Sequence, residues 1–69
     1  MLKNEIKLDV SEDQEVAYLT LPAHPGKGMP GVVKKQISLD SLITNYQGIS
    51  VYFDFDINGV LIGIEFLLD

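Results

Sequence analysis

The Asn58-Gly59 pair, set between two runs of alternating apolar residues, constrains the fold more than any other feature of the chain. Both residues tolerate positive φ, which a two-residue type I′ hairpin turn requires. Because side chains alternate along a strand, this turn brings the apolar residues of both strands onto one face. The predicted cross-strand pairs are Ile57/Val60, Phe55/Ile62, Phe53/Ile64 and Val51/Phe66.

Residues 54–65 also satisfy the EF-hand calcium pattern D-x-[DN]-x-[DN]-G-x5-E at every specified position. An EF-hand loop lies between two helices. The residues at 48–53 are mostly β-branched or aromatic, and only four residues follow Glu65, so neither helix is expected. Loop position 9 is Ile62, which has no oxygen ligand. The sequence therefore favours the hairpin.

The acidic residues of the hairpin leave a weaker alternative, a metal- or ligand-binding face. This face would hold Asp56 beside Leu61, Asp54 beside Gly63 and Tyr52 beside Glu65. Residues two apart on a strand are separated by about 6.6 Å, so Asp54 and Asp56 would not grip one ion tightly. Asp54, Asp56 and Glu65 are therefore only weak metal candidates, and the simpler interpretation is a solvated acidic face. No cofactor is predicted.

The N-terminal half predicts a second hairpin followed by a loop. Alternation over 6–10 and the apolar run 16–21 predict two strands joined by a four-residue polar turn. Residues 22–31 hold all three prolines and three of the six glycines, which predicts an irregular loop. The residues expected on one face of this hairpin are Ile6, Leu8, Ala17, Leu19 and Leu21.

A third strand is expected over roughly 33–39, followed by a short helix. Apolar residues at 39, 42, 43 and 46 have helical spacing and predict two turns over roughly 39–46. Ser38 is expected to cap its N-terminus and Gly48 to end it.

Together these elements predict an α+β, mainly β domain spanning residues 1–69. Its antiparallel meander sheet would have about five strands and one short helix, in the order β-β-β-α-β-β. One short helix cannot cover such a sheet, so either the first hairpin folds over the last or a second copy does. The core of a domain this small, without disulfides, gives only marginal stability. Because association with a second copy adds stability, we predict a homodimer. The residues predicted to form the interaction surface are Tyr18, Tyr52, Phe53, Phe55, Ile62, Ile64 and Phe66.

Composition excludes several classes of function. Ten acidic and five basic residues give a net charge of −5, which argues against binding to nucleic acids or anionic membranes. No signal peptide or long apolar run is evident, so a cytoplasmic location is expected. His24 is the single histidine and lies far in sequence from any acid; it is expected to be an exposed loop residue. With no catalytic set in view, no enzyme activity or catalytic residue is predicted.

The segment from Asp54 to Leu67, DFDINGVLIGIEFL, resembles the signature of a small bacterial family, domain-of-unknown-function family 2283. Ala17-Tyr-Leu-Thr-Leu21 is similar to the first motif of that family, although Glu15 stands where an aspartate is usual. The resemblance implies a β-rich fold and brings no established activity. It also implies a small regulatory role in bacteria, with toxin neutralisation among the suspected ones. The resulting hypothesis is a non-enzymatic interaction module that self-associates and has a possible protein partner.

Overall fold

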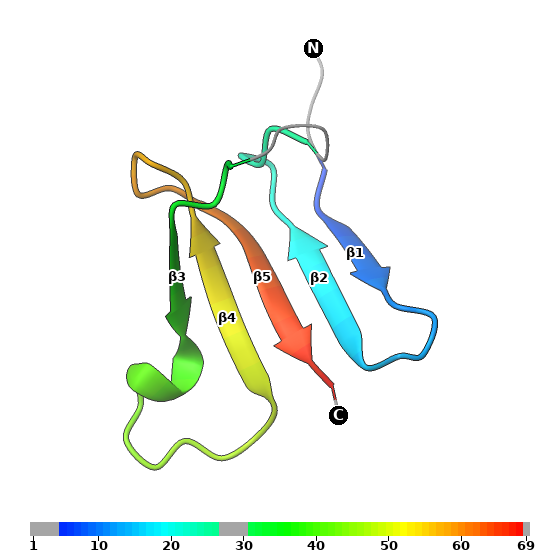
Figure 1. Ribbon diagram of the computed structural model, residues 1–69, viewed down its shortest axis with the longest axis vertical. Helices are drawn as coiled ribbons and strands as arrows, with labels where there is room; N and C mark the ends of the chain where they lie inside the picture. The colour runs from blue at the N-terminus through cyan, green and yellow to red at the C-terminus, as the bar shows by residue number, and fades with distance from the viewer. Residues whose placement is uncertain (1–4, 27–30, 69) are drawn as a thin grey trace.

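The computed structural model describes residues 5–26 and 31–68, which form one antiparallel sheet of five strands (Figure 1). Its elements are β1 (Lys7–Val10), β2 (Val16–Thr20), β3 (Lys35–Ser38), the 3-10 turn η1 (Leu39–Ser41), β4 (Ser50–Phe55) and β5 (Leu61–Leu67). The mainly β class, the strand content and the two hairpins predicted from the sequence are confirmed. No helix in the described part of the chain is long and apolar enough to cross a membrane.

The strand order is β1-β2-β5-β4-β3, which differs from a simple meander. The C-terminal strand β5 lies at the centre of the sheet, between β2 and β4 (Figure 1). The segment after β2 therefore crosses to the far edge, where β3 begins. This order puts the most apolar strand, with its fully buried Ile62, between two neighbours rather than at an exposed edge.

The strand registers sort the side chains into rows that run across the whole sheet. The apolar face carries the rows Leu8, Leu19, Ile64, Phe53, Ile37 and Val10, Ala17, Phe66, Val51. The polar face carries the rows Asp9, Tyr18, Glu65, Tyr52, Ser38 and Lys7, Thr20, Gly63, Asp54, Gln36. The predicted shared face of the first hairpin is confirmed, with Leu8 opposite Leu19.

The turn of the last hairpin differs from the prediction. The Asp56 N–H donates to the carbonyl of Val60 (3.0 Å), and Gly59 N–H donates to that of Asp56 (3.0 Å), which closes a three-residue loop. Gly59 has φ +81°, whereas Gln14 and Asn45 are the non-glycine residues with positive φ in the described chain. Asn58 therefore does not adopt the type I′ conformation. The Asp56 Oδ1 atom accepts the N–H groups of Asn58 and Val60 (2.9 Å each), and this side-chain turn favours the longer loop.

The longer loop shifts the register by one residue, and a second irregularity restores it. Phe55 pairs with Leu61, whereas Asp54 pairs with Gly63, so Ile62 has no partner on β4. The predicted pairs Phe53/Ile64 and Val51/Phe66 are confirmed, and so are Asp54/Gly63 and Tyr52/Glu65. The pairs Phe55/Ile62, Ile57/Val60 and Asp56/Leu61 are wrong for this reason.

The predicted helix over 39–46 is also wrong, because the chain forms only η1 there. Ser38 Oγ donates to Asp40 (2.7 Å) rather than accepting a backbone N–H, so it does not cap the turn. Asn45 has φ 63°, which ends any right-handed helix, and Leu42 remains 62% exposed. Ile43 is also 49% exposed, so much of the apolar stripe is not buried, and short helices depend on such burial for stability.

Candidate functional site

A buried carboxyl group lies at the middle of the polar face. Asp54, on β4, is 5% exposed. Its Oδ2 accepts the Tyr18 hydroxyl from β2 (3.0 Å), and its Oδ1 accepts the Gln36 amide from β3 (2.8 Å). A buried carboxyl group without hydrogen bonds would be costly, so these two donors allow it to remain under the side chains around it. The three residues connect strands β2, β4 and β3 on one face.

Gly63 makes the contact between Tyr18 and Asp54 possible. It lies on β5, the strand that separates the two residues, and it pairs with Asp54. A Cβ atom at this position would collide with the hydroxyl end of the Tyr18 ring. The glycine is therefore needed for space, since it lets the aromatic ring cross the backbone of the central strand.

The pKa of the Tyr18 hydroxyl is raised from 10.0 to about 12. Burial is the main cause, because it disfavours the charged phenolate. The hydrogen bond to Asp54 also raises this pKa, and so do the negative charges of Asp54 and Glu65. Tyr18 thus remains a neutral donor throughout the physiological range, in a region of negative potential.

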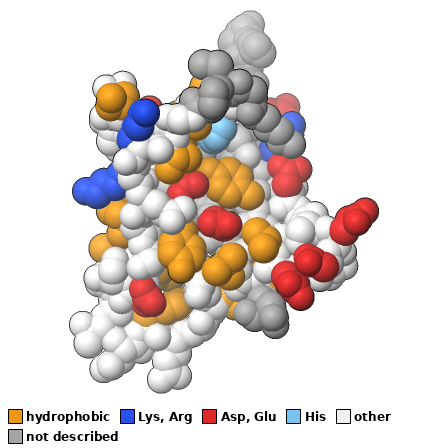
Figure 2. Space-filling view, in the orientation of Figure 1, with side chains coloured by type: hydrophobic (Ala, Val, Ile, Leu, Met, Phe, Trp, Pro, Cys, Tyr) orange, Lys and Arg blue, Asp and Glu red, His pale blue; other side chains and the backbone are white. Residues whose placement is uncertain are grey.

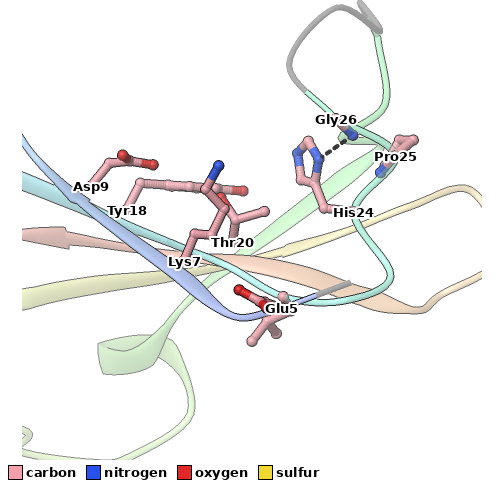
Figure 3. Close-up of a pocket in the computed structure, with 9 residues that line it drawn as sticks. Glu5, Lys7, Asp9, Tyr18, Thr20, His24, Pro25 and Gly26 are labelled. Carbon is pink, nitrogen blue, oxygen red and sulfur yellow. Dashed lines mark hydrogen bonds between the residues drawn. The ribbon is translucent and has the colours of Figure 1, made fainter. Parts of the chain in front are cut away.

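A pocket of about 550 Å³ opens beside Tyr18, between the polar face of β1 and β2 and the segment that follows β2. Figure 3 shows Lys7, Asp9, Tyr18 and Thr20 on the same side of the sheet as His24. The Gly26 N–H donates to His24 Nδ1 (3.0 Å), which fixes the ring with its proton on Nε2.

The histidine and tyrosine rings of this pocket meet edge to face, with centroids 6.4 Å apart and an angle of 82° between their planes. His24 is half-buried, and its backbone N–H donates to the Leu21 carbonyl (2.9 Å). The expectation of an exposed loop histidine is therefore wrong. The predicted 22–31 loop is described at both ends, and its residues 27–30 lie outside the described part of the chain.

The three weak metal candidates do different things. Asp54 is buried and hydrogen-bonded, Asp56 holds the turn through two backbone N–H groups, and Glu65 lies beside Tyr18 and Tyr52 on the sheet. Among residues 5–26 and 31–68, no group of three or more His, Cys, Asp or Glu side chains could hold a metal ion. The residues of the EF-hand pattern form a strand, a turn and a second strand, which confirms the hairpin.

The predicted interaction residues are divided between the two faces. Phe53, Ile64 and Phe66 lie on the apolar face, and Phe55 joins them by alternation along β4. Tyr18 and Tyr52 lie on the polar face. Ile62 is 0% exposed and offers no surface to a partner.

Sequence reasoning missed the residues that complete the polar face. The sequence places Gln36 within the strand expected over roughly 33–39 and Gly63 beside Asp54, and neither position by itself indicates a contact with a buried carboxyl group. A glycine in the interior of an apolar strand is a known sign of close approach by another group, and this signal could have pointed to Tyr18. Figure 2 shows acidic side chains among hydrophobic ones over the middle of this face, with the histidine near its upper edge.

No family model, curated protein or solved structure matches the chain. The resemblance of its C-terminal segment to family 2283 therefore stays a prediction from the sequence.

Proposed function

We propose that this protein is a non-enzymatic interaction module that self-associates by packing the apolar faces of two copies against each other. The observation that carries the proposal is a continuous apolar face that crosses all five strands. The described strands form a single layer, and no second layer lies over this face (Figure 1). The first hairpin extends the sheet instead of folding over it. Stable domains bury such a face against another layer, and a second copy supplies one.

The size of the core supports this proposal. Within the described residues, the buried apolar side chains are Ala17, Val51 and Ile62, whereas Leu8 and Val10 on the apolar face are 60% and 51% exposed. The accessible surface is 5088 Å² for 7.7 kDa. A compact monomer of this mass exposes about 4,300 Å². The chain thus exposes about 800 Å² more surface than a compact monomer of its mass, as expected for a sheet with one uncovered face.

The distribution of charge favours a second copy as the occupant of the apolar face. Asp9, Asp54 and Glu65 all lie on the polar face, and the two apolar rows carry no charged side chain. Lys35 pairs with Phe55 and therefore lies on the apolar side at the edge of the sheet. Two copies can therefore stack without bringing their acidic residues together, despite a net charge of −5 on each chain.

Sedimentation or light scattering at tens of micromolar tests the proposal. We expect a dimer for the native chain and a monomer for the double variant L8K/V10K, because both side chains are exposed in one copy and would be buried between two. The matched control is Ile57→Lys, at a hairpin tip that is 76% exposed and outside the apolar rows. A native chain that is monomeric under these conditions, or an I57K variant that dissociates as fully as L8K/V10K, would overturn the proposal.

A further inference from the structure

The pocket beside Tyr18 lies on the polar face, away from the surface proposed for self-association. Its floor is formed by side chains from β1 and β2, and the segment after β2 forms its other wall through His24 and Pro25 (Figure 3). Its volume of about 550 Å³ is within the range of about 300–1,000 Å³ that is usual for small-ligand pockets. Neither the fold nor the proposed dimer requires this opening.

Two aromatic rings line the pocket at right angles. The Tyr18 hydroxyl is anchored on Asp54, and the His24 ring is held by the Gly26 N–H on its Nδ1. Each ring is thus fixed before any ligand arrives, which lowers the entropy cost of binding. A corner of two aromatic rings is suited to a cationic group, since the face of an aromatic ring attracts positive charge.

The charged residues around the two aromatic rings also favour a cationic ligand. Glu5 and Asp9 line the pocket, and Lys7 is the one basic side chain in its described lining. Asp54 and Glu65 add negative potential from behind, as the raised Tyr18 pKa shows. The net charge of −5 would further attract cations and repel anions.

We propose that this pocket binds an alkylammonium or guanidinium group against Tyr18 and His24, with Asp9 and Glu5 as its counter-charges. The group can be that of a free amine or of a lysine or arginine side chain on a peptide. The exposed ammonium of Lys7 is a local competitor, because it lies in the same row as Thr20 and lines the same opening.

The opposite preference, for an anion, would use Lys7 and the Nε2 proton of His24. The two ligand classes make opposite demands on Lys7. If a cation binds, then replacing Lys7 by methionine removes a repulsion and strengthens binding. If an anion binds, then the same change removes the main attraction and weakens binding. This substitution therefore separates the two interpretations by the sign of its effect.

Amide NMR of the full chain provides the test, with butylamine, butylguanidine and a tetralysine peptide as cationic probes and inorganic phosphate as the anionic one. We expect saturable shifts at Tyr18 and at residues 24–26 with the cationic probes at millimolar concentration. Lys7→Met should tighten binding at least twofold, and Asp9→Asn should weaken it severalfold. Glu12→Gln, which removes the same charge from a turn outside the pocket, should change it by less than twofold.

Tetralysine that binds at least tenfold more tightly than butylamine would identify a peptide side chain as the source of the group, and comparable affinities would identify a free amine. Absent or non-saturable shifts, binding of phosphate alone, or weaker cation binding by Lys7→Met would overturn the proposal. The L8K/V10K variant should bind the cationic probes as the native chain does. A failure of self-association is therefore distinguishable from a failure of this site.

Discussion

At the residue scale, the polar face depends on three residues from three strands that fit only in one arrangement. Tyr18 must cross β5 to reach Asp54, and Gly63 is the point of crossing. If the register of β2 on β5 moved by one residue, Tyr18 would face the apolar side and Asp54 would lose a donor. The buried carboxyl group therefore selects a single pairing of these strands, because a buried polar atom without a partner costs about 1–3 kcal/mol.

Substitution of Gly63 by alanine tests this arrangement. The added Cβ would displace the Tyr18 ring, and we expect a loss of about 1–3 kcal/mol in the free energy of unfolding, measured in urea. In the Tyr18→Ala background the same substitution should cost markedly less, since the ring is gone. Equal costs in the two backgrounds would show that Gly63 is not there to accommodate Tyr18.

The raised Tyr18 pKa makes the stability of the fold sensitive to alkali. The folded chain retains a proton that the unfolded chain releases near pH 10, because the pKa rises from 10.0 to about 12 on folding. This contribution is complete below pH 10 and is lost as the pH rises through 12. We expect Tyr18→Phe to show a smaller loss of unfolding free energy between pH 9 and 11.5 than the native chain. A parallel decline in the two proteins would contradict this assignment.

At the element scale, the last hairpin shows how a turn can change while its strands keep their faces. The Asp56 carboxyl group selects a three-residue loop, and the resulting shift is taken up at Ile62, which has no partner on β4. The pairing from Asp54 to Val51 is the same as a two-residue turn would give. Two local irregularities therefore preserve the separation of apolar and polar faces, which burial enforces along the rest of β4 and β5.

Replacement of Asp56 by alanine should destabilise this hairpin. The change removes an acceptor shared by the N–H groups of Asn58 and Val60, and we expect a loss of about 1 kcal/mol in unfolding free energy. Asp56→Asn keeps one acceptor oxygen and should cost less. The Asn58 and Val60 amides should also exchange faster with solvent in the alanine variant. Unchanged exchange at both amides would show that the carboxyl group does not hold the turn.

At the scale of the whole molecule, a single-layer sheet explains why the chain is extended for its length. Its radius of gyration is 12.9 Å, against about 11 Å for a compact domain of 69 residues.

If a second copy supplies the missing layer, folding and association are linked. The midpoint of thermal unfolding should then rise with protein concentration for the native chain and for I57K. It should be independent of concentration for L8K/V10K, and scanning calorimetry over a hundredfold range of concentration measures the difference.

The sequence by itself determined the strands and the separation of apolar from polar residues. It also determined that residues 54–65 form a hairpin rather than an EF-hand. These features follow from local rules, since alternation and turn residues act between neighbours in the chain. The pairing of Phe53 with Ile64, and the position of Leu8 on the same face as Leu19, were predictable for that reason. The helix predicted over 39–46 is wrong because its apolar spacing is not matched by burial, since Leu42 and Ile43 stay largely exposed.

Only the tertiary structure decided which strands became neighbours and what the polar residues did. The central position of β5 follows from burying its apolar residues between two strands. Which strands pair depends on segments far apart in the sequence, and a local pattern of residues does not determine it. That placement brings Tyr18 across Gly63 to Asp54, and it leaves His24 over the opening beside them. A buried carboxyl group and an aromatic corner arise from contacts between residues far apart in the chain, so their geometry exists only once the sheet is assembled.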